Sequence, residues 1–240
     1  MGSNILLISG IIALIGVSVW MAKKQKQELK LNVVVVNDTI DKPVAFGYKC
    51  IWFAVKTTDQ KGVAEIIGLK NVVASNWEHG IKKAYEASVF ITPPVEGWTL
   101  VVGWGLPSGD SVESLEEVKA LANKLSRKYG EAQFFGTHRV VEYHCWLKSI
   151  NGKTERLYSY LGESGENIAV EGEPTAFEDQ YNFINTLSAE AQNKSYFDRE
   201  DLDHPNEELI MEIAGAWSIN PQLIENNNTI QGLGLLGTLK

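Results

Sequence analysis

Residues 140–161 read VVEYHCWLKSINGKTERLYSYL and carry a clear signal for the fold. Two strand-like runs, residues 140–148 and 156–161, lie on either side of Asn151-Gly152. An Asn-Gly pair in this position is typical of a tight hairpin turn, because both residues tolerate the left-handed backbone that the turn requires. The stretch therefore predicts two antiparallel strands.

Outward from this hairpin, apolar periodicity predicts the other elements. Residues 46–55 are largely apolar at both alternating sets of positions, which predicts an interior strand. Residues 112–129 show the clearest helical repeat, and Gly130 ends it. Further strands are predicted at residues 31–36, 89–92, 98–104 and 132–135, and further helices at residues 61–69, after the capping residues Ser75-Asn76, and at 175–187 and 205–217.

The order of these elements indicates the fold class. From residue 46 it is strand, helix, helix, strand, strand, helix and then three strands. This order favours an α+β fold over a doubly wound parallel fold. We predict a mostly antiparallel sheet with helices packed on one face, built from residues 31–162.

The N-terminal region has the character of a membrane anchor. Residues 1–22 carry no charge, and residues 5–22 are 18 largely apolar positions. At about 1.5 Å per residue these span roughly 27 Å of the hydrocarbon core, which is about 30 Å thick. We predict a single transmembrane helix within residues 1–22 that contacts the lipid bilayer through residues 5–22. A cleaved signal peptide is the alternative, but Trp20 stands where cleavage requires a small residue.

Lysines after the apolar run predict the orientation. They lie in a basic linker, residues 23–30, at Lys23, Lys24, Lys26 and Lys30. Positively charged flanks stay in the cytoplasm, so we expect a cytoplasmic domain. An exported domain is the alternative, and there Cys50 and Cys145 could form a disulfide.

Charge is distributed unevenly along the chain. The formal net charge of -8 excludes a basic protein whose default partner is nucleic acid. Residues 161–240 hold 15 acidic and 3 basic side chains. We predict an acidic, mainly helical C-terminal appendage over residues 163–240 and a basic protein as its partner.

The densest cluster of reactive side chains comprises His138, Arg139, Glu142 and His144. On one strand the two histidines would lie about 20 Å apart, at roughly 3.3 Å per residue, too far to share a metal ion. Glu142 and His144 could act together as acid and base. A hydrolase or metal-dependent enzyme that uses this pair, with His138 or Arg139 as an auxiliary group, is therefore the alternative function. We expect instead a polar sheet face with cross-strand pairs.

Aromatic and acidic side chains support the prediction of partner binding. Trp98 and Trp104 bracket a predicted strand beside Gly- and Pro-rich loops, where an exposed tryptophan can serve as an anchor. The acidic run that precedes the predicted helix 205–217 contains Asp198, Glu200, Asp201 and Asp203.

Two stretches resemble cofactor-binding motifs but lack residues that these motifs require. The loop 103–109 has Ser108 where a dinucleotide loop requires its third glycine, and Asp110 would repel a phosphate. Asp201, Asp203 and Glu212 fall at ligand positions of a calcium loop, but Pro205 offers no side-chain oxygen and Asn206 replaces the required glycine. We expect no nucleotide, no metal and no other cofactor.

The sequence thus predicts a membrane-anchored, non-catalytic module that binds a basic protein through an acidic surface. Immunity proteins, which neutralise a toxin by covering it, are small acidic binders of this kind, although no motif links this chain to them.

Overall fold

The computed structural model describes residues 34–35, 39–227 and 230–239. The predicted anchor and basic linker, residues 1–30, lie outside the described residues. Within the described part of the chain, no helix is both long and apolar enough to span a bilayer.

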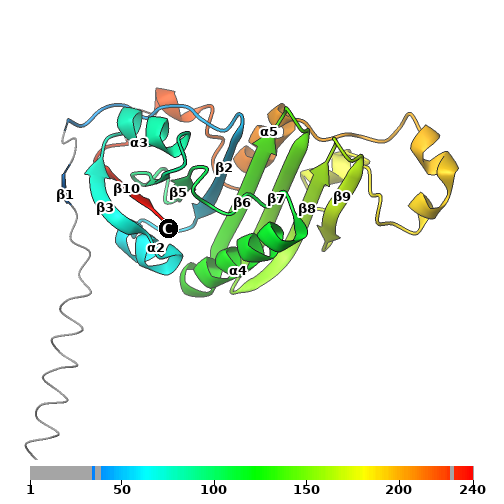
Figure 1. The fold of residues 1–240 in the computed structure, drawn as a ribbon, viewed down its shortest axis with the longest axis horizontal. Coiled ribbons are helices and arrows are strands. Elements are labelled where there is room, and N and C mark those ends of the chain that lie inside the picture. The colour runs from blue at the N-terminus through cyan, green and yellow to red at the C-terminus, as the bar shows by residue number, and fades with distance from the viewer. Residues whose placement is uncertain (1–33, 36–38, 228–229, 240) are drawn as a thin grey trace, which may run out of the picture. The chain divides into compact units, whose positions relative to one another are not determined.

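The described residues form an α+β fold around one sheet (Figure 1). The strands are β1 Val34–Val35, β2 Cys50–Val55, β3 Lys70–Ser75, β4 Val89–Ile91, β5 Thr99–Val102, β6 Glu131–His138, β7 Tyr143–Ile150, β8 Lys153–Leu161, β9 Glu166–Glu171 and β10 Gly234–Thr238. The helices are α2 Gln60–Ile67, α3 Trp77–Ala84, α4 Val112–Tyr129 and α5 Glu207–Trp217. Short 3-10 turns are η1 Glu178–Gln180, η2 Glu190–Gln192, η3 Lys194–Asp198 and η4 Ile224–Asn226.

The strands follow the order β1-β3-β10-β4-β5-β2-β6-β7-β8-β9. Nine of them pair antiparallel, and β1 adds two residues that run parallel to β3. The mostly antiparallel α+β fold is therefore confirmed.

Several elements form where the local sequence signals predict them. Asn151 and Gly152 have φ angles of 50° and 87°, as the hairpin turn between β7 and β8 requires. Helix α4 has the predicted bounds, and Ser111 caps it by accepting a hydrogen bond from the Ser114 amide at 3.2 Å. Asp59 and Asn76 cap α2 and α3 in the same way.

The expectation that all helices pack on one face is wrong. Helices α3 and α5 contribute to a core cluster with Trp52, Phe135 and Trp146 on one face of the sheet. Helix α4 covers the opposite face, in front of β6 to β8 in Figure 1, where Val118 and Phe134 lie together beside Gly109. The physical reason is that strands such as β2 are buried at every position, so both faces require a cover.

The C-terminal part also differs from the mainly helical appendage that we expected. Helix α5 confirms the predicted helix at residues 205–217, but β9 and β10 are strands of the sheet. Strand β10 lies between β3 and β4 and pairs antiparallel with both. The reason is that Leu235 and Leu236 are buried in the sheet, which they reach only at this position.

The predicted helix at residues 175–187 is not formed. Residues 173–204, which we call the arm, run from the end of β9 toward α5 with only the short turns η1, η2 and η3. Tyr181 and Phe183 stack with ring centroids 5.1 Å apart, and Phe183 lies 5.2 Å from Trp146 on the sheet. Contact with the sheet therefore holds this segment extended.

Candidate functional site

The arm is fixed to the sheet by a buried ion pair. Arg156 of β8 donates to the Glu178 carboxylate at 2.9 Å, and the two side chains are 5% and 0% exposed. Trp146 Nε1 donates to the same oxygen at 2.7 Å, and the Thr175 amide and hydroxyl donate to the other oxygen. The carboxylate is fully satisfied, which is the condition under which a buried charge is tolerated.

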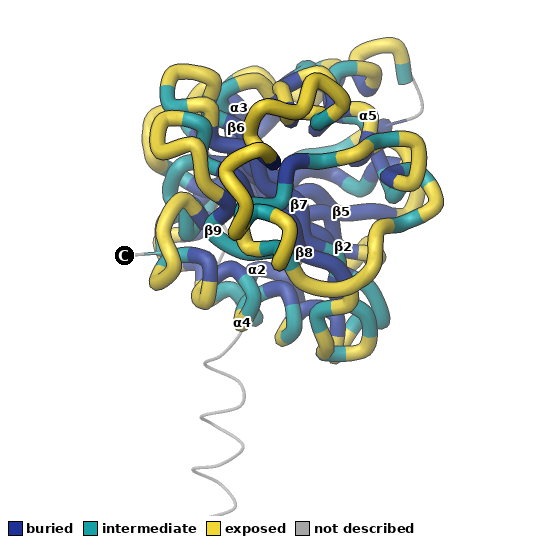
Figure 2. Tube along the Cα trace, turned by 90° about the vertical axis from the view of Figure 1, so that its right-hand side faces the viewer, coloured by how far each residue is buried: buried dark blue, intermediate teal, exposed yellow. Residues whose placement is uncertain are grey.

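The surface of the arm carries mainly negative charge. It holds eight acidic and two basic side chains, and of the acidic ones only Glu178 is buried. Figure 2 views the molecule from this side and shows exposed loop segments in front of buried strands. The exposed carboxylates are those of Glu173, Asp179, Glu190, Asp198, Glu200, Asp201 and Asp203.

Two of the four predicted acidic contact residues hold the arm together. Arg199 donates to Asp201 at 2.6 Å and keeps the pKa of that carboxyl at about 2. Asp203 accepts a hydrogen bond of 2.7 Å from the Asn182 amide, which links an inner part of the arm to its end before α5. Asp198 and Glu200 are exposed and make no hydrogen bond or ion pair with the described residues.

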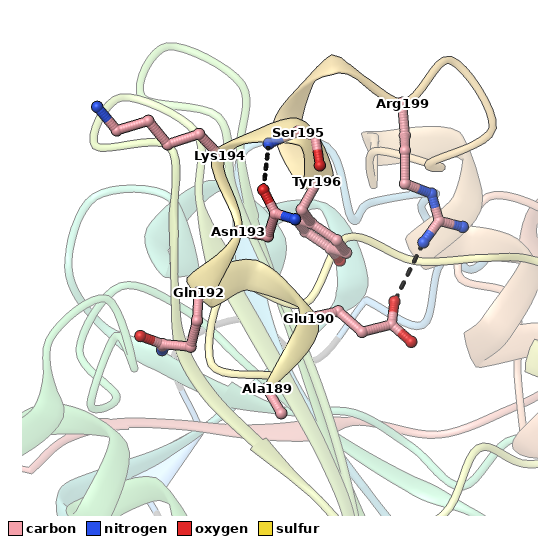
Figure 3. Close-up of a pocket in the computed structure, with 8 residues that line it drawn as sticks. All are labelled: Ala189, Glu190, Gln192, Asn193, Lys194, Ser195, Tyr196 and Arg199. Atoms are coloured by element: carbon pink, nitrogen blue, oxygen red, sulfur yellow. Dashed lines mark hydrogen bonds and ion pairs between the residues drawn. The ribbon is translucent and has the colours of Figure 1, made fainter.

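A surface hollow of about 840 Å³ lies between η2 and η3 in the same arm (Figure 3). Glu190 and Arg199 point toward one another across it, 3.1 Å apart, and Asn193 accepts from the Ser195 amide at 3.1 Å. Lys194 points outward. Since these groups pair with one another, the hollow has a polar lining. They are not arranged as the groups of a catalytic site.

The two predicted tryptophans occupy different environments. Trp98 is only 9% exposed and belongs to the core, where Lys56 Nζ lies 5.8 Å from the centre of its ring. Trp104 is half-buried, donates from Nε1 to the Lys49 carbonyl at 3.2 Å and packs edge-on against His138. Trp104 is therefore the better placed of the two to contact a partner.

The strand that we predicted at residues 140–148 begins only at Tyr143, and residues 138–145 do not form one strand. Strand β6 ends at His138 and β7 begins at Tyr143, because the chain turns between them and Glu142 adopts a φ of 52°. Glu142 lies exposed in this turn, whereas His144 is buried on β7. His138, Glu142 and His144 therefore do not lie together on one strand, as the alternative use of Glu142 and His144 as acid and base assumed.

His144 instead belongs to a buried polar chain. Its Nδ1 lies 3.0 Å from the Thr137 hydroxyl, which is 3.4 Å from Glu207 Oε1. Arg139 lies 3.7 Å from the other Glu207 oxygen and is itself exposed. Burial lowers the pKa of His144 to about 4, so the imidazole is neutral near pH 7. Within the described residues, no group of three or more His, Cys, Asp or Glu side chains is arranged to hold a metal ion.

The two cysteines are buried thiols on different strands. Cys50 pairs in register with Thr137, whereas Cys145 pairs with the next residue, Gly136, so their side chains point to opposite faces of the sheet. Burial raises the pKa of each thiol to about 12. A disulfide between them is therefore excluded in this fold.

No protein-family model, curated protein or solved structure matches this chain.

The sequence contains a pattern that indicates the extended conformation of the arm. Tyr181 and Phe183 are two positions apart, the spacing of an extended segment that faces an apolar surface. That spacing opposes a helix at residues 175–187. The roles of Arg156 and Glu178, in contrast, depend on partners distant in sequence, so no local pattern reveals them.

Proposed function

We propose that this protein is a membrane-held, non-catalytic module whose acidic arm binds a basic protein partner, in the manner in which immunity proteins cover a toxin. The observation that carries the proposal is the arm itself. It exposes seven carboxylates against two basic side chains, and buried contacts fix it to the sheet.

Physical chemistry favours this role for such a surface. Like charges held close together on a fixed scaffold create a potential that attracts an oppositely charged protein and speeds its association. The aromatic contacts and the Arg156–Glu178 pair hold the arm in place before binding. Association therefore does not include the entropic cost of ordering the arm. Asp198 and Glu200 remain free to receive lysine or arginine side chains.

Carbodiimide crosslinking of the full-length protein in detergent to proteins of its source cells tests the proposal. This reagent joins carboxylates to lysine amines, so we expect crosslinks to a basic partner at Asp198 and Glu200. The variant Asp198→Asn/Glu200→Gln should weaken binding on the order of tenfold, since each exposed charge pair contributes about 0.2–1 kcal/mol. Added salt should weaken the wild-type complex in the same direction.

A matched variant controls for charge alone. Glu78→Gln/Glu113→Gln removes two exposed carboxylates from α3 and α4 and should leave binding unchanged. Binding that resists raised salt, or that falls equally in both double variants, would argue against the arm as the contact surface.

We also propose that residues 5–22 span the bilayer and that the folded domain faces the cytoplasm, on the basis of the four lysines that follow the apolar run. Protease added to intact cells should then spare residues 31–240, and permeabilised cells should lose them. Digestion in intact cells would instead assign an exported domain.

A further inference from the structure

A second hollow, of about 460 Å³, lies away from the arm, between the turn after β5, helix α4 and the end of β10. Its walls are mainly apolar and include Leu106, Pro107 and Leu239. The lining also includes one half-buried aromatic side chain, Trp104, and one carboxylate, Glu117.

Glu117 is the one charged residue among the described residues that line this hollow. Its side chain makes no ion pair or hydrogen bond within the described part of the chain, unlike Glu116, which pairs with Lys119 at 3.0 Å. Glu117 is exposed, so it attracts a cation as a surface carboxylate does, and the apolar side chains of the hollow can cover an apolar stem. The hollow therefore favours a ligand with a positive charge and an apolar stem.

Trp104 is held firmly in the wall of the hollow. Its indole Nε1 donates to the Lys49 carbonyl at 3.2 Å, and its backbone amide donates to the Ala84 carbonyl at 3.0 Å. Contact with the edge of His138, at 5.6 Å between ring centres, orients the ring further. A fixed indole that lines the same hollow as a carboxylate suits a cation, because the aromatic face carries negative charge density.

We propose that this hollow binds an arginine side chain of a protein partner, with the guanidinium between Glu117 and Trp104 and the stem against Leu106 and Pro107. The source of the arginine rests on the proposed function, which supplies a basic partner. Guanidinium is favoured over ammonium because it is planar, stacks on aromatic rings, gives up its hydration more easily and bonds a carboxylate through two N–H groups.

Chemical-shift titration tests this assignment with a defined probe. Butylguanidinium is added to the ¹⁵N-labelled full-length protein in detergent, and the indole signal of Trp104 is identified by its disappearance in Trp104→Phe. We expect a saturable shift of that signal. Butylurea has the same shape without the charge and should leave the signal in place, whereas butylammonium should bind more weakly than butylguanidinium.

Variants distinguish a specific site from general attraction. Glu117→Gln should weaken butylguanidinium binding about two- to fivefold, as expected for loss of one exposed charge pair. Glu113→Gln, one turn earlier on α4 and outside the hollow, should have no effect. Equal binding of butylurea, or an equal loss in both variants, would overturn the proposal.

Two further variants distinguish the hollow from the arm, and a partner's arginine from Lys240. Asp198→Asn/Glu200→Gln should leave the butylguanidinium titration unchanged, so failure at the hollow does not bear on the arm and the reverse also holds. Lys240 follows Leu239 in the sequence. Stronger butylguanidinium binding in Lys240→Ala would show that Lys240 competes for the hollow and would overturn the assignment to a partner.

Discussion

Glu178→Ala should lower the free energy of unfolding by about 3–5 kcal/mol, the range for breaking a buried ion pair by removing one partner. The substitution leaves the Arg156 side chain, 5% exposed, without its carboxylate. It also removes the acceptor of Trp146 Nε1 and both contacts of Thr175. The arm would lose its buried ion pair with the sheet, so the partner binding that we propose should weaken as well.

Urea unfolding of the full-length protein in detergent, followed by tryptophan fluorescence, measures this effect. Glu173→Ala, an exposed position in the same arm, is the matched control and should change stability by less than about 0.5 kcal/mol. The double variant Arg156→Met/Glu178→Leu should recover only part of the loss, because apolar side chains can replace the buried ion pair but leave Trp146 Nε1 and Thr175 without their acceptor. Similar midpoints for Glu178→Ala and Glu173→Ala would show that the pair contributes little.

A chain that ends at Gly232 should fail to unfold cooperatively, because it lacks β10. This strand pairs with β3 on one side and β4 on the other, so its loss divides the sheet. The truncation also removes Leu235 and Leu236, which are only 6% and 7% exposed in the intact sheet. The apolar surface that these side chains cover would then be open to water. Truncating a buried leucine to alanine costs about 2–5 kcal/mol, and a whole domain is stable by only about 5–15 kcal/mol.

Near-ultraviolet circular dichroism and limited proteolysis of the truncated chain measure this prediction. A chain that ends at Thr238 retains β10 and should unfold like the full-length protein. If the shorter chain cannot be purified, Leu236→Ala gives a milder test, with an expected loss of about 2–5 kcal/mol. Cooperative unfolding of the chain ending at Gly232 would show that residues 233–240 are dispensable, as expected for an appendage.

Elements with local signals were predictable from the sequence. Helix α4 combines an apolar repeat, a serine cap and a terminal glycine, all within about twenty residues, and its bounds match the prediction. The β7–β8 hairpin follows from Asn151-Gly152 in the same way. These signals are local because a helix or tight turn is stabilised by contacts between near neighbours in the chain.

The candidate site was predictable only in part, because its geometry depends on long-range contacts. Val140 and Val141 favour a strand, yet the chain turns there, and the Gly162 amide donates to the Glu142 carbonyl at 3.0 Å. This turn separates Glu142 from His144. Likewise, Trp98 and Trp104 bracket the same predicted strand, but only packing decides that the first is buried and the second half-buried.

The sequence by itself determined the helices α2 to α5, most strands, the acidity of the C-terminal third and the α+β class. Only the tertiary structure decided that both faces of the sheet are covered, that β10 enters its interior, and that Glu178 is buried while Asp198 and Glu200 stay free. The reason is physical. Propensity and periodicity act between near neighbours, whereas strand order and the pairing of buried charges are set by contacts between residues far apart in the chain.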